Sequence, residues 1–492
     1  MTAHTFLWHD YETFGVEPRI DRPAQFAAIR TDAELNEIGE PINVYCKPTP
    51  DYLPDPQSCL ITGITPQHCL EHGLVEHEFA AVIERALSAT GTIGVGFNTI
   101  RFDDEITRFL FWRNLIDPYA REWQNGCGRW DILDLVRTAY ALRPEGIEWP
   151  LHGDGRPSFK LQDITAANGL LHDSAHDALS DVRATIAVAR LIRRCQPRLF
   201  DFCVALHKKE RVAQEIGWPQ QRPFLHVTGM VPPERGCIAL VWPLANHPSN
   251  KNELIVWDLA YDPQILSTIT AEEMRVRMFS KTEALPDGVT RLPIKTIHLN
   301  KSPVVISNLK TLSADRALCW GIDLPSTMRH AEIAAGSAPS QKLWEQVFER
   351  PAKAPVDVDE DLYGAFVGNS DRQRMAELRT MTPEQLATTS MHFDDVRLEE
   401  LVFRYRARNF PDALNIADQQ RWSQHCSMRL FGAAATSQTS HAISCTVTRT
   451  GIRTVETMFD QIDQLSENID ERGEQILGAL YDYIELIAPE RT

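Results

Sequence analysis

The first 200 residues alternate between strand-like and helical patterns, and this alternation limits the possible fold more than any other feature of the chain. Strand-like runs come first, and helical runs then mix with them. Such an order is typical of a mixed β-sheet covered by helices. We therefore expect an α/β domain over 1–200, with strands near 5–10, 24–31, 41–46 and 92–97 and helices near 75–88, 103–115, 131–142, 160–169 and 177–195.

The rest of the chain changes character twice. Turn signals separate short β-rich runs, which predicts a small barrel-like β domain over 201–350. A linker is expected at 331–361, which is rich in Ala, Pro, Ser and acidic residues. The remaining pattern is mostly helical, with a loop expected at 434–451, so we predict a helical C-terminal domain over 351–492. The β-rich runs are 224–227, 237–242, 254–257 and 303–306.

Composition indicates a soluble protein of several domains. A length of 492 residues exceeds one ordinary core, and 43% hydrophobic with 24% charged residues is typical of globular proteins. We expect neither a membrane span nor a signal peptide, because no apolar run approaches the needed length and the N-terminus lacks a basic region before an apolar one. Ten scattered cysteines without a Cys-x-x-Cys motif indicate reduced thiols and a cytoplasmic protein. The net charge of −17 neither supports nor excludes a polyanionic partner, since local basic residues can line a groove.

Two carboxylates, Asp10 and Glu12, follow the first apolar run. Side chains two positions apart on a strand point to the same face of the sheet. Like charges held that close repel, and a divalent cation would relieve the repulsion. Taken alone, an Asp-x-Glu is more often a polar strand end or a turn.

Two further segments supply candidate ligands. Asp103 follows the apolar run 92–97 at the expected start of a helix, where the helix dipole favours a carboxylate. Its neighbour Asp104 is expected to be a solvated acid of the first turn. Asp181 is expected in the second turn of the helix at 177–195, which His176 precedes or opens. A neutral imidazole near a metal can take a proton from water, although a helix-opening histidine is more often a cap or a surface residue.

Together the four acids Asp10, Glu12, Asp103 and Asp181 suit Mg²⁺ or Mn²⁺ and not zinc, because the set lacks Cys and His ligands. Two such ions, roughly 4 Å apart, would clamp a phosphodiester, with one activating water and the other stabilising the leaving oxygen.

The ordered motifs resemble those of the DEDD exonucleases in their His-containing branch: Asp-x-Glu at 10–12, Asn-x-x-x-Phe-Asp at 98–103 and His-x-x-x-x-Asp at 176–181. The resemblance implies a 3′→5′ exonuclease on an RNase H-like fold, with the four acids as ligands and His176 as the general base. Longer segments are similar to the bacterial exonuclease I family, which degrades single-stranded DNA from its 3′ end. These segments are 9–15, 21–31, 60–66, 141–147 and 405–411.

The same resemblance implies partners and a setting. The family binds the acidic C-terminal tail of single-strand-binding protein, and we expect a monomer with a role in DNA repair and recombination. The similarity covers the whole first domain and continues to about 425, and it fades over roughly 320–360 and 425–492.

Cations interleaved with aromatics favour single-strand binding. The cations and aromatics that follow Asp103 show this pattern, although ordinary surface charge or partly buried aromatic packing would explain any one of them about as well. The resemblance favours Lys160 most, because the matching family position contacts the terminal nucleotide, and it places 60–65 against that nucleotide. We also expect the two later domains to enclose the strand, through Trp242, Trp257, Arg404, Arg406 and Arg408. The expected substrate-binding residues are Glu12, Arg108, Tyr119, Trp123, Arg137 and Lys160.

The prediction is thus a magnesium-dependent exodeoxyribonuclease that releases 5′-mononucleotides. Three alternatives remain open: the same site acting on RNA ends, a decayed exonuclease that only holds single strands, and a scaffold for repair partners. All five catalytic positions carry the expected residues, which counts against decay.

Overall fold

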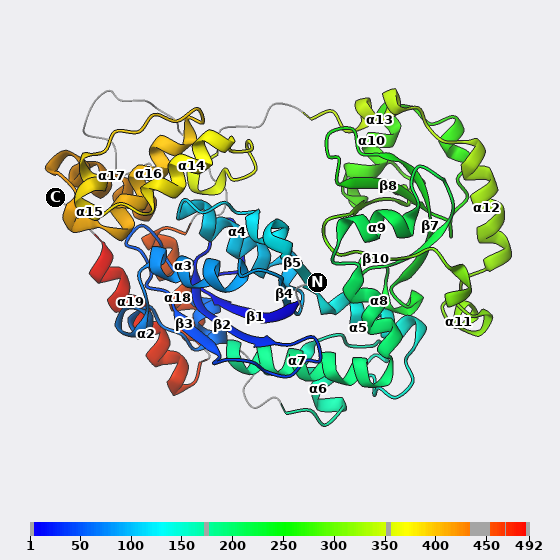
Figure 1. Cartoon of the computed structure of the whole chain (residues 1–492), viewed down its shortest axis with the longest axis horizontal. Helices are drawn as coiled ribbons and strands as arrows, with labels where there is room; N and C mark the ends of the chain where they lie inside the picture. The colour runs from blue at the N-terminus through cyan, green and yellow to red at the C-terminus, as the bar shows by residue number, and fades with distance from the viewer. Residues whose placement is uncertain (1–3, 172–176, 351–355, 433–452, 468, 489–492) are drawn as a thin grey trace.

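The computed structural model describes residues 4–171, 177–350, 356–432, 453–467 and 469–488, which form three lobes (Figure 1). The first lobe contains a five-stranded sheet, the second contains another five-stranded sheet, and the third is helical. The predicted fold class is confirmed. Within these ranges no helix is long and apolar enough to cross a membrane.

The first sheet is mixed and has the strand order β3-β2-β1-β4-β5. The central β1 pairs antiparallel with β2 and parallel with β4, and β4 pairs parallel with β5. The four predicted strands are confirmed, whereas β5 was missed because its four residues carry no apolar alternation. The strands are β1 (Thr5–Thr13), β2 (Pro23–Thr31), β3 (Ile42–Tyr45), β4 (Thr92–Gly96) and β5 (Gly128–Asp131).

Both faces of this sheet are covered, because successive residues of β1 point to opposite sides. Phe6 and Trp8 belong to the core beneath α7, and Leu7 and Tyr11 belong to the core beneath α3 and α4. The five predicted helices are confirmed, and the segment 60–65 spans the turn between two short helices that were not predicted. The helices are α1 (Pro56–Thr62), α2 (Pro66–His72), α3 (Glu76–Leu87), α4 (Asp103–Arg113), α5 (Ile132–Leu142), α6 (Leu161–Ala167) and α7 (Ala178–Cys195).

The second sheet is entirely antiparallel, with the order β10-β6-β7-β8-β9. Four strands match the predicted β-rich runs, and β9 was missed. The strands are β6 (Phe224–Val227), β7 (Ile238–Asn246), β8 (Glu253–Asp258), β9 (Ile294–His298) and β10 (Val304–Ile306). Helices around this sheet are α8 (Pro197–Ala205), α9 (Lys209–Ile216), α10 (Ala271–Phe279), α11 (Ala314–Cys319), α12 (Leu324–Gly336) and α13 (Gln341–Val347).

The predicted linker at 331–361 is wrong over much of its length. Helix α12 continues to Gly336 and α13 follows, with Ala331, Ala334 and Trp344 buried in the core of the second lobe. Alanines were read as linker residues, but their small side chains let a helix pack closely.

The third lobe is built from helices, and its last two return to the first lobe (Figure 1). Met458 on α18 and Leu480 on α19 are buried in one cluster with Phe14 and Cys59 of the first lobe. The predicted loop at 434–451 lies outside the described residues. The helices are α14 (Asn369–Leu378), α15 (Pro383–Thr388), α16 (Arg397–Asn409), α17 (Ile416–Phe431), α18 (Val455–Ser466) and α19 (Glu471–Ile487).

Candidate active site

The structure brings together three of the predicted ligands. Asp10 and Glu12 share one face of β1, and Asp181 approaches them from α7. One carboxylate oxygen of each lies within 4.8 Å of the others. Asp181 lies in the first turn of α7, not in the second as expected, because the helix begins at Ala178 after the cap Asp177. Three carboxylate oxygens at this spacing could hold one divalent cation.

Asp103 lies beside this group, at the first position of α4. Its Oδ1 accepts a hydrogen bond of 3.1 Å from the backbone N–H of Tyr11, the residue between Asp10 and Glu12. Asp103 is not within the three-oxygen group, but its charge acts on Asp10. We call Asp10, Glu12, Asp103 and Asp181 the acid cluster.

Burial and neighbouring carboxylates raise the pKa values of Asp10, Glu12 and Asp103. Burial, followed by the charges of Asp103 and Glu12, raises the pKa of Asp10 well above its ordinary range. Burial and the charge of Asp181 raise the pKa of Glu12 to about 8, and burial raises that of Asp103 to about 8. These shifts mean that the ionised cluster is unfavourable unless a cation is present.

The donor set fits a hard divalent cation. Among the described residues, no Lys or Arg forms an ion pair with Asp10, Glu12 or Asp103. Carboxylates without Cys or His are the ligands that Mg²⁺ and Mn²⁺ prefer. His176 lies outside the described residues. Its neighbour Asp177 accepts a hydrogen bond of 3.0 Å from the N–H of Ser180 and caps α7.

A residue that sequence reasoning missed, Asp131, holds the loop that leads to Asp103. At the end of β5 it accepts hydrogen bonds from the N–H groups of Asn98 (2.8 Å) and Ile100 (3.2 Å). Asn98 has a φ of 65°, so the chain turns sharply there. An aspartate at a predicted helix start was the available signal, since Asp131 also caps α5.

Asp104 is not solvated, contrary to the expectation from sequence. It is 1% exposed and accepts from Arg121 at 2.6 Å and from Arg129 at 3.0 Å. Because these two arginines are far from Asp104 along the chain, no local pattern predicted the pairing.

The predicted substrate residues lie in different surroundings. Lys160 is exposed at the start of α6, and Trp123 is 66% exposed. Tyr119 is half-buried, with the Arg108 guanidinium 5.3 Å from its ring, and Arg137 pairs with Asp134 at 2.6 Å.

Arg108 is buried and engaged with protein groups. Its guanidinium contacts Glu105, Glu122 and the Tyr363 hydroxyl at 2.7–3.0 Å. These partners favour a structural role for Arg108, and a substrate contact stays a prediction.

The expected strand contacts from the later lobes need correction. Trp242 and Trp257 are buried in the core of the second lobe. Arg404 pairs with Asp357 and Asp359, and Arg408 pairs with Asp51 of the first lobe at 2.7 Å. Arg406 pairs with Asp418 at 3.2 Å. Arg404 and Arg408 are buried in ion pairs and are not available for phosphates in this arrangement. Arg406 is only partly buried, and a phosphate contact by it stays a prediction.

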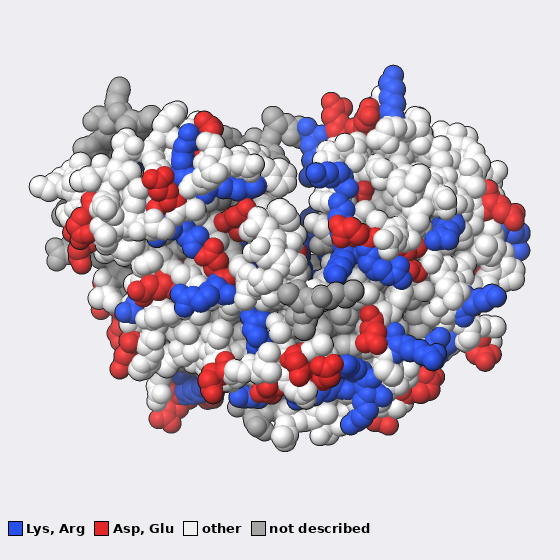
Figure 2. Space-filling view, in the orientation of Figure 1, with Lys and Arg blue, Asp and Glu red and all other residues white. Residues whose placement is uncertain are grey.

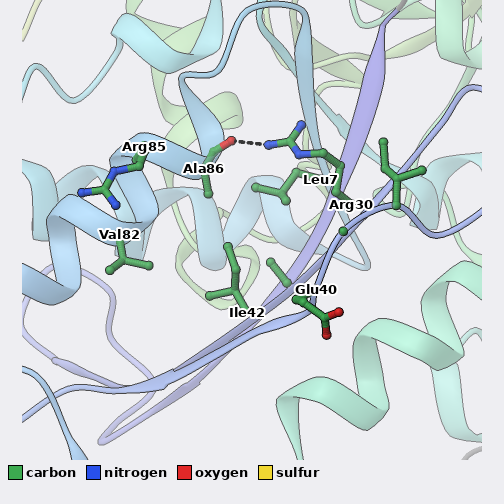
Figure 3. Close-up of a pocket in the computed structure, with 10 residues that line it drawn as sticks. Leu7, Arg30, Glu40, Ile42, Val82, Arg85 and Ala86 are labelled. Atoms are coloured by element: carbon green, nitrogen blue, oxygen red, sulfur yellow. Dashed lines mark hydrogen bonds between the residues drawn. The ribbon is translucent and has the colours of Figure 1, made fainter.

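A cavity of about 400 Å³ opens on the other face of the first sheet (Figure 3). Leu7 and Ala28 line it, and both belong to the face opposite the acid cluster. Arg30 lies at this cavity and donates a hydrogen bond of 2.6 Å to the Ala86 carbonyl. The cavity is therefore separate from the candidate active site.

Comparison with known families divides the chain into three matched segments. The family described as Exonuclease matches 7–189, the Exonuclease I SH3-like domain matches 207–350, and the Exonuclease I C-terminal domain matches 356–487.

Whole-chain relatives agree with these matches. Exodeoxyribonuclease I from Haemophilus influenzae is 42% identical over 479 residues, covering 96% of this chain and 99% of the relative. The solved structure of a moderately thermophilic exonuclease I from Methylocaldum szegediense has a TM-score of 0.90 and 44% identity, covering 99% of this chain and 100% of the relative. Escherichia coli exonuclease I in complex with a dA16 oligonucleotide has a TM-score of 0.89 and 41% identity, with the same coverage. The chain therefore belongs to the exodeoxyribonuclease I family.

Proposed function

We propose that this protein degrades single-stranded DNA from the 3′ end to 5′-mononucleotides, with two Mg²⁺ ions that Mn²⁺ can replace. The observation that carries the proposal is the acid cluster, in which one carboxylate oxygen each of Asp10, Glu12 and Asp181 lies within 4.8 Å of the others. The charges of Asp103 and Asp181 add to burial in raising the pKa values of Asp10 and Glu12. One crystal structure of a related Escherichia coli exonuclease I–single-stranded DNA complex is a zinc-ion-bound form, which supports metal binding in this family.

Asp10, Glu12, Asp103 and Asp181 would hold the ions, and Glu12 would also face the terminal nucleotide. When bound, the two cations supply an activated water and neutralise charge on the transferring phosphate. His176 is proposed to accept the proton from the attacking water. Lys160 would orient the terminal phosphate as a point charge, without the bidentate geometry of an arginine.

Single-strand binding is proposed to use Arg108, Tyr119, Trp123, Arg137 and Lys160. Exposed Trp123 offers a face for stacking and exposed Lys160 a charge for a phosphate. Figure 2 shows the surface hollowed between the second and third lobes, with Lys and Arg side chains along the edge of the second lobe. A channel there would admit one strand and exclude a duplex by width.

The test is digestion of matched end-labelled oligomers with the full chain: single-stranded DNA, its duplex and an RNA of the same sequence, each with Mg²⁺ or with EDTA. Stepwise 3′ shortening of the single DNA strand, only with Mg²⁺, is expected. Preference for RNA would support the alternative RNA exonuclease, and binding without cleavage would support a strand-holding protein.

The wider setting is also a proposal. Scattered thiols, unpaired at the nine described cysteines, suit a reducing cytoplasm. Action as a monomer in DNA repair and recombination, in contact with the acidic tail of single-strand-binding protein, follows from the family resemblance.

A further inference from the structure

A second group of charged side chains lies behind Asp103, and apart from the strand contact proposed for Arg108 it takes no part in the proposed chemistry. Asp104 pairs with Arg121 and Arg129, and Glu122 lies 3.3 Å from Nε of Arg129. Glu122 also accepts two hydrogen bonds from Arg108, at 2.7 and 3.0 Å. Glu105 pairs with Arg108 at 2.7 Å, so three carboxylates face three guanidinium groups. We call the set the α4 charge cluster: Asp104, Glu105, Glu122, Arg108, Arg121 and Arg129.

The α4 charge cluster reaches the second lobe through Arg129 on β5. Nη2 of Arg129 donates a hydrogen bond of 3.1 Å to the carbonyl of Asn300. The Ser302 hydroxyl donates one of 2.8 Å to the backbone carbonyl of Arg129. Asn300 and Ser302 lie between β9 and β10, so a single residue links the second sheet to the first turn of α4.

The same cluster reaches the third lobe through Tyr363. The Tyr363 hydroxyl lies 3.0 Å from Nη1 of Arg108 and also bonds the carboxylate of Glu105. Figure 1 shows α4 and β5 between the other two lobes. Both accessory lobes therefore contact one buried set of charges at α4.

The α4 charge cluster contacts the first turn of α4, where Asp103 is the first residue. Helix α4 has no side-chain cap at its N-terminus, where Phe102 occupies the cap position. The adjacent Asp104 supplies two buried, charge-assisted contacts instead. Such contacts are short and directional, so they fix the rotation of the first turn and with it the direction of the Asp103 carboxylate.

We infer that Arg129 is a positioning residue, through which the second lobe fixes the metal ligand Asp103. The inference rests on the proposed metal-dependent function. Arg129 would never touch the ion or the DNA. It would act through Asp104, and Tyr363 would act from the third lobe through Arg108 and Glu105.

The test measures Mn²⁺ binding to the full chain without DNA, by isothermal titration calorimetry, alongside thermal unfolding. Arg129→Lys keeps the charge but loses the fork that reaches Asp104 and Asn300 together. Its Mn²⁺ affinity should fall by about tenfold or more, as for other residues that orient ligands from behind. Ser302→Ala removes one hydroxyl contact and Tyr363→Phe removes two, and each should weaken Mn²⁺ binding by about two- to fivefold.

Arg113→Lys is the matched control. Arg113 lies at the other end of α4, is as buried as Arg129, and bonds Glu76 at 2.7 Å. The Arg113→Lys substitution should lower the unfolding temperature without changing the Mn²⁺ affinity. Wild-type affinity in a folded Arg129→Lys protein, or an equal loss in Arg113→Lys, would overturn the inference. If Arg129→Lys does not fold, unchanged affinity in both Ser302→Ala and Tyr363→Phe overturns it instead. Absence of Mn²⁺ binding by the wild-type protein would refute the proposed function.

Discussion

Asp103 and Asp104 are adjacent in sequence and both are buried, yet their carboxylates lie in opposite electrostatic surroundings. Burial raises the pKa of Asp103 to about 8 in the acid cluster. Arg121 and Arg129 hold the pKa of Asp104 well below its usual range in the α4 charge cluster, although burial alone would raise it. One cluster therefore has an excess of negative charge and the other is balanced.

The comparison separates residues that stabilise the fold from residues that prepare a site. A buried charge with good partners is costly to remove, because the partners are left unpaired. A buried charge beside like charges is costly to keep, and proteins retain such groups at functional sites. The predictions below test this contrast from its largest expected effect to its smallest.

The largest effect is expected from Asp10→Ala. Loss of a ligand should remove several kcal/mol of transition-state stabilisation, on the order of 10³-fold in rate or more. The protein should stay folded, because the change relieves repulsion with Asp103 and Glu12. Cleavage of a labelled single strand measures the rate, and Asp287→Ala, at an exposed acid, is the control. Near-normal turnover by Asp10→Ala would refute the ligand assignment.

His176→Ala should lower kcat by roughly 10²–10⁴-fold, the usual contribution of a general base. Affinity for a labelled strand, measured by fluorescence anisotropy in EDTA, should be nearly unchanged. This variant should leave the unfolding temperature close to that of the wild-type protein. A defect confined to affinity would instead assign His176 to substrate binding.

Neutralising the two adjacent acids should change stability in opposite directions. Asp104→Asn leaves Arg121 and Arg129 without their carboxylate and should lower the free energy of unfolding by roughly 3–5 kcal/mol. Asp103→Asn should raise it in metal-free buffer at pH 8, because a charge with no described cationic partner is removed. Denaturant unfolding of both variants, followed by circular dichroism, measures the difference. Destabilisation of similar size in both would contradict the contrast between the two clusters.

The smallest effect is a pH dependence of the metal-free protein. The folded pKa values of Glu12 and Asp103, about 8, lie above their ordinary values of 4.5 and 3.8. Their contribution to stability is therefore fully present below about pH 4 and is lost as the pH rises towards 8. The unfolding temperature of Asp103→Asn minus that of the wild type should increase from pH 5 to pH 8 in EDTA. Mg²⁺ should reduce this increase, and a constant difference across the range would count against the raised pKa values.

Much of the first lobe was predictable, because its strands and helices carry strong local periodicity. Strands β1, β2 and β4 and helices α3, α4 and α7 match the predicted positions within a few residues. Strands β5 and β9 escaped prediction, since β5 is four residues long and β9 is only half-buried and gives a weak pattern. Helices α12 and α13 were not predicted, because their alanines and the Pro and Ser residues between them are typical of a linker.

The candidate ligands were also predictable, whereas the partners of the arginines were not. The ligands follow recognisable motifs, but Arg408 pairs with Asp51, which is 357 positions away in the sequence. The apolar cluster that joins α1 to α18 and α19 shows the same limit. A chain ending near residue 200 would expose that cluster and remove the Arg408 and His425 partners of Asp51, so point variants of the full chain are better tests than truncation.

The sequence by itself determined the order of elements, the family and the four acids at which a metal is proposed. These depend on residue type and spacing, which are local properties of the chain. Only the tertiary structure decided which charges are compensated, because ion pairing depends on burial and on neighbours that are distant in sequence. For that reason Asp103 and Asp104 read alike in the sequence, and only the folded protein separates a candidate ligand from a structural anchor.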